Sequence, residues 1–149
     1  MTVFGIDPGS RSGAVGWTGP QGAGVSDLPL IDGFVDPHAL SALLSGQSDA
    51  QTVFVENVSA LPKQGVASTF KFGRAFGTIL ATVQLSGLRL ELVTPRTWKK
   101  HHRLGRDKES ARALAIRRFP RLASDLARKK DADRAEALLI ADFGRAMLG

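Results

Sequence analysis

Four carboxylates are the residues of this chain whose types and spacing point to chemistry. Asp7 and Glu56 each close a short apolar run that is typical of a strand. Asp133 and Glu136 lie three residues apart in a segment with helical spacing, which places them on one helix face. Four such acids would repel one another unless cations neutralised them, and hard divalent ions are the natural partners of carboxylate oxygens. The pattern predicts two Mg²⁺ ions, with Mn²⁺ as a substitute, as in two-metal phosphodiester hydrolysis.

A further acid, Asp131, leaves one alternative open. It lies two residues before Asp133, so on a continuous helix the two side chains would point to opposite sides. We therefore favour Asp133 as the partner of Glu136 and keep Asp131 as the substitute. A purely structural role is the competing interpretation, since acids near a helix N-terminus interact favourably with the helix dipole.

The composition narrows the class of protein. The chain has 149 residues, no cysteine, and 20 Lys and Arg against 14 Asp and Glu, a net charge of +6. This length predicts a single domain over residues 1–149. The lack of cysteine excludes a disulfide scaffold, thiol catalysis and cysteine-ligated metals. Neither a membrane-spanning run nor a signal peptide is visible, so we expect a cytoplasmic protein with a polyanionic partner.

The apolar spacing and turn residues predict the elements that carry the acids. Their order, β-β-β-α-β-α-β-α-α, indicates a mixed α/β domain that begins with an antiparallel hairpin. Predicted strands cover residues 3–6, 14–17, about 24–28, 52–55 and 88–93; predicted helices follow Asp36-Pro37 and cover about 65–85, 107–119 and 133–147. In the helix at 65–85, Phe70 belongs to the apolar series, and Gly73 and Gly77 suggest close packing against another element.

Six segments resemble a known family. Residues 5–17 are similar to the first-strand signature of RuvC-type Holliday junction resolvases, residues 53–57 resemble their second acidic strand, and residues 134–141 resemble their acidic C-terminal helix. Residues 70–77, 94–100 and 107–112 look like the phage-type branch of that family. The resemblance implies an RNase H-like fold, a homodimer, possible phage origin and Mg²⁺-dependent symmetric nicking of four-way DNA junctions.

Site residues carry over from the resemblance by position. Asp7, Glu56, Asp133 and Glu136 would be the metal-binding acids, although the bacterial pattern has Asp where this chain has Glu136. Lys99 and Lys108 match positions expected near the scissile strand, where a cation stabilises charge developing on phosphate. We expect Lys108 to act in catalysis.

Basic residues in three clusters, at 63–74, 89–106 and 108–130, would bind DNA phosphates. The candidate DNA-binding residues are Phe70, Lys71, Arg74, Arg96 and Lys99. Phe70 would be a base-stacking wedge, or else core or dimer interface. Trp98 would stack on a base or anchor a short helix.

Two other functions fit the same residues. A broader RNase H-like debranching nuclease would use the same acids and differ only in substrate range. A non-catalytic junction-binding protein would bind DNA without cutting it. An actin-like ATPase also begins with a Gly-Ile-Asp-x-Gly loop, but it needs two such domains, which 149 residues do not provide.

Overall fold

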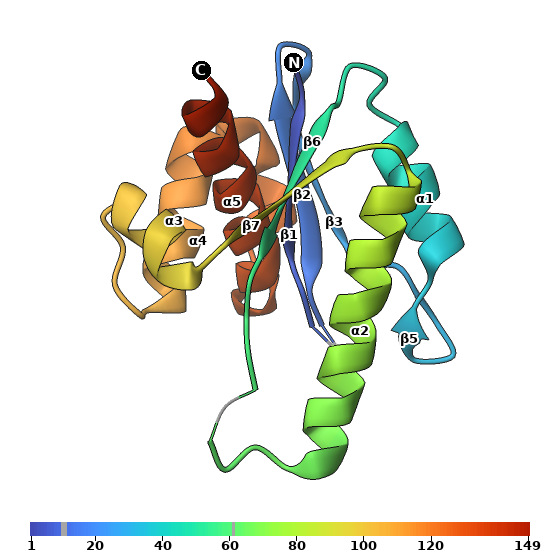
Figure 1. The fold of residues 1–149 in the computed structure, drawn as a ribbon. Helices are drawn as coiled ribbons and strands as arrows, with labels where there is room; N and C mark the ends of the chain where they lie inside the picture. Colours follow the sequence, from blue (N-terminus) through green and yellow to red (C-terminus); the bar gives the residue numbers. More distant parts are fainter. Residues whose placement is uncertain (10–11, 61) are drawn as a thin grey trace.

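A five-stranded mixed sheet runs through the computed structural model, which describes residues 1–9, 12–60 and 62–149 (Figure 1). The strand order is β3-β2-β1-β6-β7, with β1 at Val3–Asp7, β2 at Ala14–Gly19, β3 at Gly22–Asp27, β6 at Thr52–Glu56 and β7 at Arg89–Val93. The first three strands pair antiparallel, whereas β6 is parallel to β1 and β7 is parallel to β6. The predicted hairpin start and α/β class are confirmed. Ser10 and Arg11, in the predicted turn after β1, lie outside the described residues.

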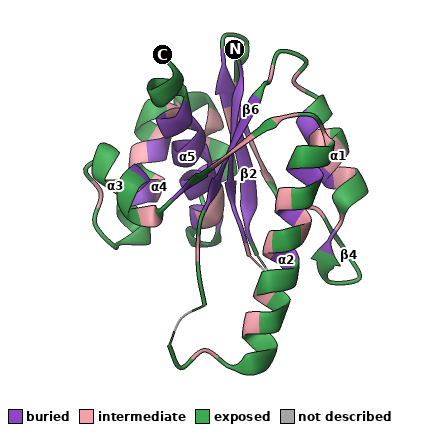
Figure 2. Ribbon diagram, viewed as in Figure 1, coloured by how far each residue is buried: buried purple, intermediate pink, exposed green. Residues whose placement is uncertain are grey.

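Helices cover both faces of this sheet. On one face pack α1 (Pro37–Ser45) and α2 (Val66–Leu85), and on the other α3 (Pro95–His101), α4 (Lys108–Arg118) and α5 (Ala132–Leu148). Short 3₁₀ turns at Pro120–Leu126 and Lys129–Asp131 join α4 to α5. Figure 2 shows the buried residues gathered in the strands, in α5 and on the sheet-facing sides of the other helices.

Two glycines allow α5 to lie directly against the sheet. A Cβ on Gly5 would come within 2.3 Å of the Ala137 carbonyl oxygen, and one on Gly16 within 2.6 Å of the Leu138 Cα. Any side chain at these positions would push α5 away from β1 and β2. The close packing fixes the distance between the acid at the end of β1 and the acids on α5.

A small hairpin is absent from the predicted order of elements. Strands β4 (Leu30–Ile31) and β5 (Phe34–Val35) pair antiparallel around Asp32 and Gly33, whose φ angles are 52° and 80°. An Asp-Gly pair between apolar residues is typical of a two-residue hairpin turn, because both residues tolerate positive φ. The sequence therefore contains a pattern that predicts this hairpin.

The packing predicted for α2 is partly wrong. Its buried side is formed by Ala75, Ile79, Thr82 and Val83. Phe70 is 72% exposed, so the core alternative is wrong for it, while a base-stacking wedge and a dimer contact stay predictions. Within the described chain a Cβ on Gly73 or Gly77 would meet nothing within 4 Å, so these two glycines pack closely against none of its elements. The N-terminal turns of α2 extend beyond the end of the sheet (Figure 1), so they have no core to face.

Candidate active site

Strand alternation directs two of the predicted acids toward the same layer of helices. In β1, Phe4 and Ile6 pack toward α1 and α2, so Asp7 lies on the face that carries α5. In β6, Val53 and Val55 do the same, which places Glu56 on the α5 face. Because β1 and β6 are parallel neighbours, both acids come to the same end of the sheet.

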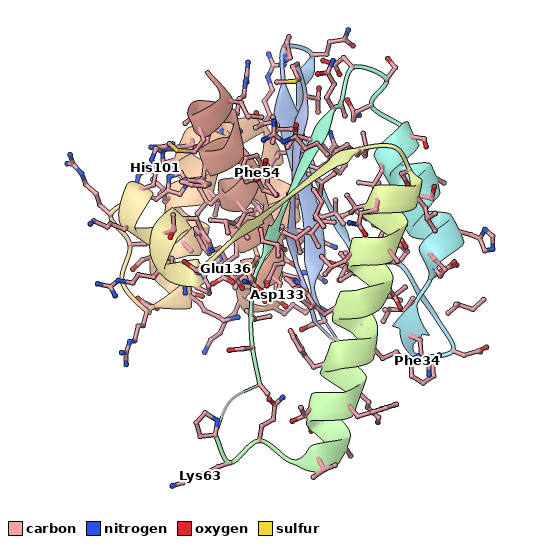
Figure 3. All side chains as sticks on the ribbon, in the orientation of Figure 1. Phe34, Phe54, Lys63, His101, Asp133 and Glu136 are labelled. Atoms are coloured by element: carbon pink, nitrogen blue, oxygen red, sulfur yellow. The ribbon has the colours of Figure 1, made fainter. Side chains whose placement is uncertain are left out.

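Asp7, Asp133 and Glu136 converge at this end. Each offers one carboxylate oxygen, and the three oxygens all lie within 4.8 Å of one another. Asp7 and Glu136 are buried, and Asp133 is partly exposed. Figure 3 shows Asp133 and Glu136 near the ends of β1 and β6. Three carboxylate oxygens at this spacing form a donor set that suits a hard divalent ion.

Glu56 is held beside this group by a separate contact. Its Oε2 accepts a 2.7 Å hydrogen bond from the indole Nε1 of Trp98, and both side chains are buried. Trp98 thus anchors α3 in the core, one of the two roles predicted for it. The hydrogen bond to Glu56 was not predicted, although a buried indole N–H requires an acceptor.

Burial and mutual repulsion raise the pKa of two of these acids. The pKa of Asp7 lies well above its ordinary value, first because the carboxyl is buried and then because of the charges of Glu136, Glu56 and Asp133. Burial also raises the pKa of Glu56, with the Trp98 hydrogen bond acting in the opposite direction. A bound cation would relieve both effects.

Two lysines partly neutralise the negative charge of these carboxylates. Lys108 Nζ lies 3.2 Å from Asp133 Oδ1, and Lys99 Nζ lies 3.9 Å from Glu136 Oε1. Burial alone would lower the pKa of Lys108, but the carboxylates of Glu136 and Asp133 outweigh it and raise that pKa. Four carboxylates against two lysines leave a net negative charge at this end of the sheet, which favours the binding of divalent cations.

Asp131 lies in a different environment from Asp133. Its side chain is buried and pairs with Arg128 at 2.8 Å and with Arg134 at 3.7 Å. It also accepts a hydrogen bond from the Arg128 backbone N–H, and these contacts with Arg128 lower its pKa despite some burial. Arg134 continues the network to Asp27 on β3 at 2.8 Å. This network, which was not predicted, ties the start of α5 to the sheet and occupies the oxygens of Asp131.

The predicted DNA-binding residues fall in two places. Phe70, Lys71 and Arg74 lie on α2, where the Arg74 guanidinium stacks 3.5 Å above the Phe34 ring of the β4–β5 hairpin. Lys71 and Arg74 line a pocket of about 260 Å³ beside that hairpin. Arg96 and Lys99 lie on α3 and line a separate groove. Only the α3 group contacts the acids, through Lys99.

Comparisons with known proteins identify the architecture. No family model and no curated protein matches the chain. Among solved structures, Thermus thermophilus RuvC matches with a TM-score of 0.67 at 20% identity, over 99% of this chain and 96% of that one.

The fold is that of RuvC.

The same Thermus thermophilus RuvC in complex with a Holliday junction substrate matches with a TM-score of 0.64 at 19% identity, over 99% of this chain and 96% of that one. The fowlpox virus Holliday junction resolvase matches with a TM-score of 0.59 at 13% identity, over the full length of both chains. The predicted RuvC-like, RNase H-like fold is confirmed. In the part of the chain that the structure describes, no helix is both long and apolar enough to cross a bilayer.

Proposed function

We propose that this protein is a metal-dependent endonuclease that resolves four-way DNA junctions by paired symmetric nicks. The observation that carries the proposal is the convergence of Asp7, Asp133 and Glu136 at one end of a RuvC fold. The solved RuvC complex with a Holliday junction substrate supports the choice of substrate. The net charge of +6 suits a polyanion of this kind.

The acids and the lysines of this site would have different roles around the scissile phosphate. Asp7, Glu56, Asp133 and Glu136 would hold two Mg²⁺ ions, for which Mn²⁺ would substitute. When bound, such ions activate a water nucleophile and stabilise the leaving oxygen. Lys108 and Lys99, which already contact the acids, would orient the phosphate and offset the charge that develops on it. The products implied by the family resemblance are a 5′-phosphate and a 3′-hydroxyl.

A homodimer is part of this proposal, because a two-fold enzyme presents two sites to two symmetric strands. An exposed stripe on α2 supplies a surface for it. Val66 is 88% exposed and Phe70 72%, and Gly73, Gly77 and the exposed Ala81 continue the same side of the helix, opposite the buried Ala75 and Ile79. The small residues leave room for a second α2 to approach closely.

The deciding experiment compares three DNA substrates of equal length: an immobile four-way junction, a fork and a linear duplex. Each is incubated with Mg²⁺ and with EDTA, and Asp7→Asn is the matched control because it removes one ligand charge and leaves the basic surface intact. We expect paired nicks in the junction alone, only with Mg²⁺, and binding without cutting by Asp7→Asn.

Other outcomes would contradict the proposal. Cutting of all branched substrates would indicate a broader debranching nuclease. Tight junction binding without cutting by the wild-type protein would indicate a non-catalytic binding protein. Full activity of Asp7→Asn would show that the acid cluster is not the active site.

A further inference from the structure

The turn that follows α3 contains a residue in an unusual backbone conformation. Arg103 has a φ angle of 57°, and its N–H donates to the Lys100 carbonyl at 3.0 Å, while the Leu104 N–H donates to the Lys99 carbonyl at 2.8 Å. This pair of hydrogen bonds defines a Schellman C-cap, in which the left-handed position is usually a glycine. Arginine is disfavoured there because its Cβ crowds the backbone.

The charge of Arg103 is unpaired within the described chain. Its residue is exposed, and among the described residues its guanidinium makes no hydrogen bond or ion pair. Helix capping alone would favour glycine at this position. A disfavoured backbone conformation combined with an unpaired charge therefore indicates a role outside the folding of the chain.

Arg103 lines a strongly basic groove. The groove has a volume of about 610 Å³ and is lined by Pro95, Arg96, Lys99, Lys100, Arg103, Leu104, Gly105 and Arg106. Five of these residues are cations and none is an acid, so the groove suits a polyanion. Lys99, one of the lining residues, also reaches Glu136 with its Nζ at 3.9 Å, so this part of the groove wall adjoins the acid cluster.

We propose that this groove binds the phosphates of the DNA strand that continues from the scissile phosphate, and that Arg103 is one of its phosphate contacts. The inference rests on the proposed function, because the strand enters the groove from the acid cluster through Lys99. An arginine suits this task because its planar guanidinium donates two parallel hydrogen bonds to one phosphate. The left-handed cap is retained because it carries that side chain into the groove.

The test separates stability from DNA affinity. Arg103→Gly, Arg103→Lys and the wild-type protein are compared for thermal unfolding and for junction binding in EDTA over a series of salt concentrations. We expect Arg103→Gly to raise the Tm by about 2–4 °C, since glycine is favoured in the cap. The same variant should bind the junction about tenfold more weakly. Its salt dependence should lose about one phosphate contact, a slope change of about 0.9.

Two controls sharpen the result. Arg103→Lys keeps the charge and the left-handed backbone, so its Tm should match the wild type and most of its affinity should remain. Arg145→Gln removes one exposed charge in the last turn of α5, the opposite end of that helix from Asp133 and Glu136, and should leave affinity and slope unchanged.

The outcomes distinguish this inference from the proposed function. If the wild-type protein binds and cuts the junction but Arg103→Gly binds it equally well, the groove assignment is wrong and the nuclease proposal stands. A lower Tm in Arg103→Gly would overturn the argument from the helix cap. A wild-type protein that binds no junction would overturn both.

Discussion

The indole Nε1 of Trp98 donates a 2.7 Å hydrogen bond to Oε2 of Glu56, and this contact joins α3 to the acidic end of β6. Among the described residues, the other carboxylate oxygen of Glu56 makes no hydrogen bond. Glu56 is therefore fixed by one oxygen and can offer the second to an ion. The Thr94 side chain accepts a hydrogen bond from the Thr97 N–H and so caps α3, the helix that carries Trp98, directly after β7 ends at Val93.

Trp98→Phe should remove this hydrogen bond while keeping most of the ring packing. Loss of a buried hydrogen bond to a charged group, with a small cavity, should lower the free energy of unfolding by about 2–3 kcal/mol. With Glu56 less firmly placed, half-maximal junction cleavage should need more Mg²⁺. Chemical denaturation and a Mg²⁺ titration of cleavage check both effects.

Trp17→Phe is the control, because the Trp17 indole makes no hydrogen bond in the described chain. An unchanged Mg²⁺ requirement in Trp98→Phe would refute the positioning role of Trp98.

Asp131 and Asp133 should respond differently to the same substitution. Asp131→Asn breaks the pairing with Arg128 and should cost about 2 kcal/mol of stability while leaving most cleavage activity at low temperature. Asp133→Asn should change stability little and slow cleavage more than about 100-fold. Loss of a residue that holds the metal ion directly should cost more than loss of one that only supports such a residue. Thermal unfolding and single-turnover cleavage measure the two effects. The reverse pattern would make Asp131 the ligand.

Local patterns in the sequence were enough to predict the elements that carry the site. Asp7 and Glu56 end apolar strands, and Asp107 and Asp36 cap helices through their side chains, as the composition of these segments indicates. The i, i+3 spacing also selected Asp133 over Asp131 as the neighbour of Glu136. These features depend on periodicity over a few residues, which a sequence records directly.

Contacts between distant segments were not predictable in the same way. The Arg134–Asp27 pair joins residues 107 positions apart, and the Trp98–Glu56 bond joins residues 42 apart. The apolar spacing of α2 failed at Phe70 for a related reason, because periodicity gives the face of a helix but not the length of sheet available to cover it. Which turns extend beyond the sheet is decided by the tertiary fold.

Acidification should destabilise the protein through His102. Its ring Nε2 donates to the Leu139 carbonyl at 2.8 Å, and its buried Nδ1 has no partner among the described residues. Burial lowers the pKa of His102 below its usual value, so the folded protein resists protonation more than the unfolded chain does. The resulting stability is present above the unfolded pKa, about 6.5, and is lost as the pH falls toward the lower folded value.

The free energy of unfolding measured between pH 7.5 and 5.5 tests this dependence. His102→Gln keeps an amide donor for Leu139 and should flatten the decline. His101→Gln, at the exposed neighbouring position, should leave it in place. Identical pH profiles for wild type and His102→Gln would contradict the assignment.

Gly77→Glu should separate the dimer without harming the fold. A Cβ at Gly77 meets nothing within 4 Å, and glycine is a poor helix former, so the variant's subunit should be about as stable as the wild type or more so. In the proposed dimer, two glutamates would face each other across the α2 stripe. Light scattering should give twice 15.9 kDa for the wild type and a single 15.9 kDa chain for the variant. The control is Ser68→Glu, because Ser68 is exposed on the other side of α2, and this variant should stay dimeric. A monomeric wild type would remove the α2 interface from the proposal.

Lys108→Ala should slow cleavage far more than it weakens junction binding. The Nζ group lies 3.2 Å from Asp133 Oδ1, and the neighbouring carboxylates raise the pKa of Lys108, so the side chain stays protonated at neutral pH. A fixed cation there acts mainly on charge that develops in the transition state, for which removal of one preorganised donor costs about 10²-fold in rate. Single-turnover cleavage and binding in EDTA separate the two effects. Lys108→Arg should restore part of the rate, and Lys100→Ala, in the neighbouring groove, should affect binding more than rate. Equal losses of rate and affinity in Lys108→Ala would reduce Lys108 to an ordinary phosphate contact, because a group that binds the ground state and the transition state equally does not accelerate the chemical step.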